Sequence, residues 1–159
     1  MGQLTEEVEI IPAGTDNLEV MVDLRIQLLK EIGKLNKDDD LLKLKDKLYD
    51  YFQTNLNSGQ FKAWLALVDE QVVATSGLIY YQVPPHGDNL QGKEAYIMNM
   101  YTVPEYRGQG IATQILAEII DYAERENINK LWLRAEKEAK ALYRRVDFKQ
   151  SKRYMELKK

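Results

Sequence analysis

The sequence predicts a single α/β domain built on a mixed, mostly antiparallel sheet with flanking helices. Strand-like and helix-like segments alternate in the order β-α-α-β-β-β-α-β-α-β. One long helix joins two neighbouring strands, and such a crossover makes those strands parallel. The chain also lacks an internal repeat, a linker and a low-complexity segment. Since a length of 159 residues suits one core, residues 1–159 are expected to form one domain.

The N-terminal part of the chain is expected to form a short strand and two helices. The strand covers residues 8–11. Residues 15–16 offer an N-cap for the first helix, whose apolar residues recur at helical spacing up to Gly33. Three aspartates at 38–40 cap the second helix, and the turn residues 57–59 end it. Because capping explains this acidic run, it carries no weight for substrate specificity.

The remaining elements follow from alternation, turn residues and a further helical period. We expect antiparallel strands at 61–68 and 72–81, a loop at 83–93, a strand at 94–103, a helix at 109–126, a strand at 131–135, a short helix at 136–145 and one or two final strands. The tail at 149–159 is locally basic, but its cations alternate with apolar residues, which favours a solvated edge strand.

Composition argues against several function classes. The apolar fraction of 45% and the charged fraction of 30% are ordinary for a soluble protein. A net charge of −3 gives no support to nucleic-acid binding, and no apolar run approaches the length of a membrane span. The absence of cysteine excludes a thiol nucleophile and is compatible with a cytoplasmic protein. The single histidine, His86, cannot form a metal cluster, so no metal is expected.

The segment richest in chemical information is Arg-Gly-Gln-Gly-Ile-Ala at residues 107–112. A strand precedes it and a helix follows, so the backbone turns through Gly108 and Gly110 into a helix start. The first N–H groups of a helix have no intrahelical partner, and the helix dipole adds partial positive charge there. The glycines let a ligand approach bare backbone, and Arg107 adds a permanent cation. We therefore interpret this segment as a diphosphate site.

Spacing distinguishes this segment from other phosphate loops. A Walker loop needs Lys and Ser or Thr after its second glycine, whereas Ile and Ala follow Gly110. A dinucleotide loop needs a third glycine, which is absent. Three segments in order, at 99–106, 107–112 and 141–148, instead resemble the GNAT superfamily of N-acetyltransferases. They resemble its Val-x-Pro-x-Tyr strand end, its Gln/Arg-x-x-Gly-x-Gly/Ala loop and its Leu-Tyr-x-x-x-Gly-Phe segment.

The resemblance implies an acetyl-CoA-dependent enzyme whose parallel strands, at 94–103 and 131–135, splay apart beneath the cofactor. The main chain at Tyr101 and Val103 is then expected to hydrogen-bond the pantetheine arm as an added strand does, while the two side chains only pack. The alternative is an unbroken parallel pair without a slot. The cofactor-binding residues implied are Tyr101, Val103, Arg107, Gly108, Gln109, Gly110, Ile111, Ala112 and Thr113.

Two side chains are candidates for catalysis. Tyr143 occupies the position of the family's tyrosine that faces the coenzyme sulfur, and a phenol with a pKa near 10 can donate to a departing thiolate. The alternative is a core tyrosine. Asn99 can hold a water or orient the substrate, or it can be a satisfied polar residue near a bulge. Alternation places Asn99 and Tyr101 on one strand face and Glu94 on the other unless a bulge intervenes. The general base therefore stays open between Glu94, a water and another group.

The third segment departs from the family pattern at two places. Asp147 stands where the family has glycine, and Glu136 or Lys137 where it often has asparagine. Because aspartate adopts positive φ more readily than most residues, we expect the turn to survive.

The leading hypothesis is acetyl transfer to a primary amine of a small molecule or peptide, by direct attack in a ternary complex. The resemblance implies an acceptor cleft walled by the two N-terminal helices and the 83–93 loop. The alternative function is a catalytically weak acyl-CoA-binding regulatory or interaction module on the same scaffold. Since members of the family are often dimers, a homodimer is an option for this chain.

Overall fold

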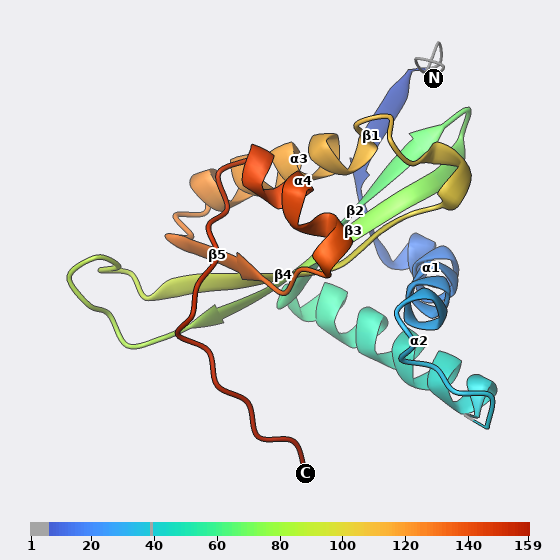
Figure 1. Ribbon diagram of the computed structural model, residues 1–159, viewed down its shortest axis with the longest axis horizontal. Coiled ribbons are helices and arrows are strands. Elements are labelled where there is room, and N and C mark those ends of the chain that lie inside the picture. The colour runs from blue at the N-terminus through green and yellow to red at the C-terminus, as the bar shows by residue number, and fades with distance from the viewer. Residues whose placement is uncertain (1–6, 39) are drawn as a thin grey trace.

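The chain folds around a five-stranded sheet whose strands lie in sequence order, as the computed structural model in Figure 1 shows. The structure describes residues 7–38 and 40–159. Strands β1 to β4 pair antiparallel, whereas β4 and β5 pair parallel, as the crossover helix predicted. The strands are β1 (Val8–Pro12), β2 (Phe61–Val68), β3 (Gln71–Gln82), β4 (Lys93–Thr102) and β5 (Lys130–Leu133).

Helices cover both faces of the sheet. One face carries α1 (Leu18–Glu31) and α2 (Leu41–Ser58), and the other carries α3 (Ile111–Arg125) and α4 (Lys140–Arg145) (Figure 1). Short 3-10 turns occur at Thr15–Asn17, Pro104–Tyr106 and Lys137–Ala139. The expected fold class, with its mixed sheet and flanking helices, is confirmed.

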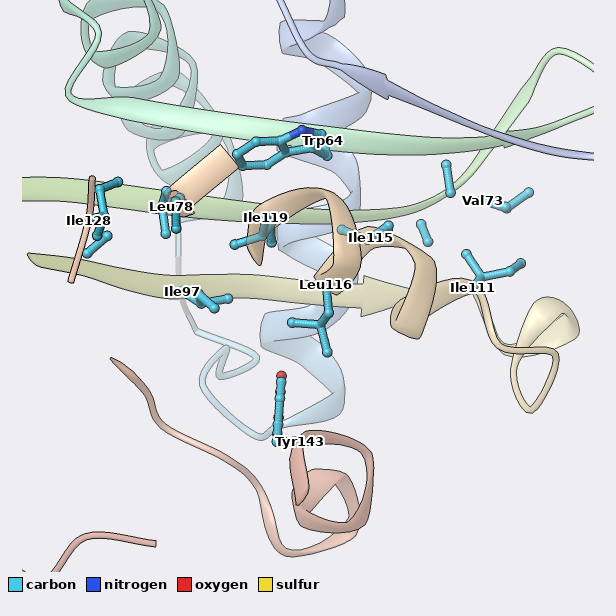
Figure 2. Close-up of a cluster of buried hydrophobic side chains, with 14 of the residues drawn as sticks. Trp64, Val73, Leu78, Ile97, Ile111, Ile115, Leu116, Ile119, Ile128 and Tyr143 are labelled. Carbon is cyan, nitrogen blue, oxygen red and sulfur yellow. The ribbon is translucent and has the colours of Figure 1, made fainter. Parts of the chain in front are cut away.

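Each face of the sheet has its own apolar core. On the α3 face, residues at helical spacing along α3 pack against β2, β3 and β4, together with Tyr143 of α4 (Figure 2). These α3 residues are Ile111, Ile115, Leu116, Ile119 and Ala123. On the α1 face, Met21 and Phe52 are almost fully buried against Phe61 and Leu65 of β2. The two cores fix the helices on the sheet and so fix the loops at the ends of the strands.

The ends of α2 follow the prediction. Asp40 caps the helix, its carboxylate accepting a hydrogen bond from the N–H of Lys43 at 3.0 Å. Gly59 ends the helix with φ at 77°, a left-handed conformation that glycine adopts without strain. Asp39, which was also expected to cap, lies outside the described residues.

The starts of α1 and α3 differ from the prediction. The N-cap expected at residues 15–16 is wrong, because these residues lie within a 3-10 turn and α1 begins after Asn17. The Asn17 side chain accepts a hydrogen bond from the N–H of Gly14 at 2.9 Å, so it stabilises the 3-10 turn that leads into the helix. The third helix begins at Ile111 instead of residue 109.

The final strands expected in the tail are also wrong. Residues 149–159 form no helix or strand and extend away from the sheet (Figure 1). Side chains attach this segment, since Arg134 beyond β5 contacts Tyr154 and forms an ion pair with Glu156 at 3.6 Å. Met155 is 94% exposed. Alternation favours a strand only where a core covers one side of it, and no core covers the tail among the described residues.

Candidate active site

The turn into α3 presents a row of free backbone donors. Gly108 and Gly110 have φ of 73° and 82°, and Gly110 is the N-cap of α3. The first N–H of the helix ladder is that of Gln114, which donates to the carbonyl of Gly110 at 3.1 Å. The N–H groups of residues 108–113 donate to no acceptor within the described part of the chain. With the helix dipole behind them, these groups suit an anionic ligand.

Arg107 lies at the start of this loop and is held by two elements, α1 and β4. Its Nη2 donates to both carboxylate oxygens of Glu31 on α1, at 3.0 and 2.8 Å, and its Nε donates to the carbonyl of Thr102 at 2.8 Å. The guanidinium carbon stands 5.4 Å from the ring centre of Tyr101. The hydrogen bond from Arg107 is the main reason that the pKa of Glu31 is lowered. The positive charge of Arg107 is therefore partly neutralised by the carboxylate of Glu31 beside the loop.

Glu31 was not anticipated from the sequence. It accepts a second hydrogen bond, at 2.8 Å, from the hydroxyl of Tyr101, which also lies 3.3 Å from the side-chain oxygen of Gln27. Tyr101 is buried, and its burial, followed by Glu31, raises the pKa of its hydroxyl. The side chain expected only to pack thus also joins β4 to α1. No local pattern could indicate a pair 70 residues apart in the sequence.

The parallel strands separate beside this loop. β4 and β5 pair only from Glu94 with Lys130 to Ile97 with Leu133, whereas β4 continues to Thr102. The second half of β4 therefore has no strand partner on its β5 side among the described residues. This is the splayed pair that the resemblance implied. We call this opening the wedge: residues 98–102 of β4 and the space where β5 leaves them.

A bulge lies inside the wedge. Met98 pairs with Gly77 and Tyr101 pairs with Thr75, so two residues of β4 stand opposite one residue of β3. Asn99 occupies the bulge with φ at 61° and is 5% exposed. Neither polar atom of its side chain has a hydrogen-bond partner in the described structure. A buried amide without partners is rare, so it points to a ligand or an ordered water at this position.

The bulge also reverses which backbone groups face the wedge. The N–H of Val103 donates to β3 at 2.9 Å, whereas the carbonyl of Thr102 points away and accepts from the arginine of the loop. Because main-chain direction alternates along a strand, Tyr101 faces β3 with Val103, and Met100 faces the wedge with Thr102. The extra residue therefore turns the main-chain groups of Met100 and Thr102 toward the wedge, where unbroken alternation would place those of Tyr101 and Val103.

The candidate base Glu94 lies at the other end of β4. Its carboxylate accepts a hydrogen bond from Tyr81 at 3.0 Å and lies 3.8 Å from the ammonium of Lys130. The bulge does intervene, so Tyr101 turns to the α1 face. Since Glu94 already has two partners away from the wedge, its geometry does not favour a role as base.

Tyr143 comes from α4 and enters the core between α3 and β4. It is 7% exposed, and its hydroxyl points toward Leu116 and Ile97 (Figure 2). Burial, with a smaller contribution from Tyr96, raises its pKa to about 12. The turn after α4 survives without glycine, since Asp147 adopts φ of 69° and lets the N–H of the next residue donate back to Tyr143 at 3.1 Å.

A cavity of about 990 Å³ lies on the far side of β5, between α4 and the tail. Tyr143 lines it, together with Leu133 and Phe148, but no residue of the loop at 107–113 does. The free donors of α3 and this cavity are therefore separate features, and the cavity results from the unpaired position of the tail.

Comparison with known proteins agrees with this geometry. Residues 29–148, more than half of the chain, match the model of the acetyltransferase (GNAT) family, and the chain belongs to that family. No curated protein matches the sequence.

Several solved structures have the same fold. A predicted acetyltransferase from Clostridium acetobutylicum, crystallised with acetyl-CoA, is 29% identical with a TM-score of 0.86, and the match covers 96% of each chain. A possible acetyltransferase from Clostridium difficile 630 is 26% identical with a TM-score of 0.76, over 97% of this chain and 98% of that one. A GCN5-related N-acetyltransferase from Ralstonia eutropha JMP134 shares the fold at 24% identity and a TM-score of 0.80, over 95% and 98%.

The described residues contain neither a helix suited to cross a membrane nor a cluster suited to hold a metal ion. None of the helices there is both long enough and apolar enough to cross a bilayer. No group of three or more His, Cys, Asp or Glu side chains in that part of the chain is arranged to hold a metal ion.

Proposed function

We propose that this protein transfers an acetyl group from acetyl-CoA to a primary amine of a small molecule or peptide, by direct attack in a ternary complex. The observation that carries the proposal is the row of free N–H groups at 108–113 next to a wedge that holds an unpartnered Asn99. One part suits a diphosphate and the other leaves polar groups free where two substrates can meet. The similarity to an acetyltransferase crystallised with acetyl-CoA supports the choice of cosubstrate.

The proposed cofactor site follows the free donors. The N–H groups of residues 108–113 hold the diphosphate at the positive end of α3. The main chain of Met100 and Thr102 at the open edge of β4 pairs with the amides of the pantetheine arm, as a strand would. Acetyl-CoA supplies an activated acyl group, and the wedge directs its thioester toward Asn99 and Tyr143.

Tyr143 is the proposed donor to the leaving sulfur. The amine nitrogen attacks the thioester carbon, the C–N bond forms, and the C–S bond breaks to leave a thiolate. With a pKa of about 12, Tyr143 stays protonated at neutral pH and donates a hydrogen bond to that sulfur. An ordinary thiol has a pKa near 8.5, so full transfer of the phenol proton is uphill. The proton that the amine loses therefore reaches the sulfur, relayed by Tyr143 or by water.

Asn99 has the proposed role of holding that water or orienting the amine. An amide cannot act as a base at neutral pH, but its free oxygen and NH₂ group can each make hydrogen bonds. The amine, having lost one proton from its ammonium form, binds in its neutral form. It loses a second proton only after its nitrogen has attacked the thioester carbon. On this scheme no carboxylate base is required near Asn99.

The experiment compares the protein with Tyr143→Phe in thiol release from acetyl-CoA and in calorimetric binding of CoA. Removing the hydroxyl is expected to lower kcat about 100-fold, at the lower end of the range for proton-transfer catalysis, and to leave CoA affinity unchanged. Acyl-CoA binding without turnover on a broad amine panel would favour the alternative, a regulatory binding module. An unchanged kcat in Tyr143→Phe would remove Tyr143 from the mechanism. The 1–159 domain extent, a homodimer and a cytoplasmic location stay predictions.

A further inference from the structure

Arg25 occupies an unusual position on α1. Apolar residues recur at helical spacing along the face of α1 that packs on the sheet, and Arg25 lies in the middle of that stripe. The core residues of this stripe are Leu18, Met21, Val22 and Ile26, and Arg25 lies among them. Leu18 and Met21 are 2% and 0% exposed, and Arg25 itself is half-buried. A charged side chain interrupts an apolar face where a leucine would pack.

Within the described structure the guanidinium of Arg25 has no counter-ion. It forms no ion pair, hydrogen bond or aromatic stacking contact with residues 7–38 or 40–159. Burial lowers the pKa of Arg25, and the phenols of Tyr96 and Tyr51 partly oppose this shift. Burying a cation without a partner destabilises a protein, so the residue is not explained by stability.

The surroundings place Arg25 next to the wedge. Helix α1 packs on β4 past the bulge, where Gln27 and Glu31 contact Tyr101, which comes after Asn99. Arg25 lies earlier on α1, and Tyr96, which comes before Asn99, partly offsets the lowered pKa of Arg25. Tyr96 also contributes to the raised pKa of Tyr143 on α4. The packing of α1 on β4 therefore places Arg25 on the α1 side of the strand that carries the bulge.

We propose that Arg25 binds an anionic group of the acceptor, so that the substrate is a primary amine carrying a carboxylate or a phosphate. This rests on the proposed function and adds the substrate class to it. A guanidinium pairs with either anion through two parallel hydrogen bonds, which restores the counter-ion that the folded protein lacks. The α1 face of the wedge then holds the anion while the amine reaches the thioester near Asn99.

The experiment uses matched pairs of amines on the full-length chain. Thiol release from acetyl-CoA is measured with amino acids of increasing length, from glycine to 6-aminohexanoate, each beside its carboxamide. Phosphoethanolamine is measured beside ethanolamine, which separates phosphate from carboxylate. The variants are Arg25→Met, which keeps the volume, Arg25→Lys, which keeps the charge, and Lys30→Met, which removes an exposed charge from the same helix.

The proposal expects the anionic member of at least one pair to have the higher kcat/KM. Arg25→Met lowers that kcat/KM about 10- to 150-fold, as a lost charge-assisted hydrogen bond does, and leaves the neutral member and CoA affinity unchanged. Arg25→Lys keeps part of the preference and Lys30→Met keeps all of it. Since an unpaired buried cation is removed, Arg25→Met also melts at the same temperature or higher.

The two proposals fail in different ways. Equal rates for every pair, or a preference that Arg25→Met leaves intact, would overturn the anionic acceptor and keep acetyl transfer. A large loss of melting temperature in Arg25→Met would show that the residue is structural and would also overturn it. If no amine is acetylated, acetyl transfer fails. Calorimetry of 6-aminohexanoate and of phosphoethanolamine, each with the CoA-bound protein, then decides the second proposal, which requires binding that Arg25→Met abolishes.

Discussion

The two halves of β4 show how one strand serves two purposes. Residues 93–98 pair on one side with β3, and from residue 94 to 97 they pair on the other side with β5. In residues 99–102 the bulge leaves Asn99 and Met100 without a paired residue, Tyr101 and Thr102 pair with β3 alone, and the other side is open. The first half is a structural strand with ordinary alternation. The second half follows a bulge and faces the loop with free N–H groups, so the difference between the halves begins at one inserted residue, Asn99.

This comparison shows that the candidate site has a local energetic cost. Asn99 is held at positive φ with a buried amide that has no partner in the described structure. An unpaired buried polar group costs about 1–3 kcal/mol, and a single positive φ outside glycine adds about 1 kcal/mol. No such cost is evident in the first half of β4. A protein under selection for stability alone would not keep this arrangement, so its presence favours function at the bulge.

The strongest way to break the comparison is to delete Asn99. Without the extra residue, Met100 alone stands opposite the single residue of β3 at this point, so β4 pairs regularly and Tyr101 keeps its partner Thr75 and its place on the α1 face. We expect acetyl-CoA turnover to fall about 100-fold, because the buried amide and the bend that the bulge introduces into β4 are both lost. Turnover is measured by thiol release and CoA binding by calorimetry. Activity near the original level would show that the bulge has no role.

A companion variant separates the bulge from the amide. Asn99→Gly keeps positive φ at no steric cost but removes the side chain. CoA binding is expected to stay unchanged while acetyl transfer falls about 10-fold, a loss of about 1.4 kcal/mol in transition-state stabilisation. The melting temperature is expected not to fall, because the loss of an unpaired buried amide offsets the flexibility of glycine. A clear fall in melting temperature would mean that Asn99 stabilises the fold.

The backbone conformation of Gly110 tests whether the loop at 107–112 binds the cofactor. Gly110 has φ of 82°, and a Cβ there would meet no atom within 4 Å, so only backbone strain opposes substitution. Gly110→Val is expected to weaken CoA binding about 5- to 30-fold, from about 1–2 kcal/mol of strain. Gly110→Asn is the control, since asparagine tolerates this conformation, and it should bind nearly normally. Equal affinity in both variants would show that the loop geometry does not bind the cofactor.

Local sequence patterns predicted the parts of this site that depend on neighbours in the chain. The glycines of the loop, the crossover helix and the capping role of Asp40 follow from spacing alone, and the structure agrees. The bulge could not be located, because it depends on how β4 pairs with a strand more than 20 residues earlier. The main-chain groups of Tyr101 and Val103, which the resemblance implied as pantetheine contacts, therefore face β3.

Two other features needed the folded structure. Glu31 accepts a hydrogen bond from Arg107, which lies 76 residues away in the sequence, and no local motif encodes such a pair. The tail alternates as a strand does, yet the pattern cannot say whether a partner lies beside it, and Met155 and Leu157 are exposed. Arg25 was not anticipated from the sequence, and its lack of a counter-ion among the described residues is a property of the fold.

The smallest expected effect concerns the carboxylate that faces Arg107. Glu31→Gln removes a negative charge beside the free N–H groups of the loop, so the local potential becomes more favourable for a diphosphate. We expect CoA to bind about 2- to 5-fold more tightly at low salt, with the gain lost in high salt as charges are screened. Titration calorimetry at two ionic strengths measures this. Glu105→Gln, which removes a nearby charge without an ion pair to Arg107 in the described structure, is the control.

The same variant has a consequence for stability that depends on pH. Because Arg107 lowers the pKa of Glu31 in the folded state, the pair stabilises the fold above the ordinary glutamate pKa of 4.5. That contribution disappears as the pH falls through the lowered folded-state pKa. Both side chains are about half exposed, so solvent screening limits the effect to less than about 1 kcal/mol. Glu31→Gln should therefore unfold slightly more easily at pH 7 and match the original protein once the pH is below the lowered pKa of Glu31. Weaker CoA binding in Glu31→Gln would instead make Glu31 a positioning residue for Arg107, and would extend the functional half of the comparison from β4 onto α1.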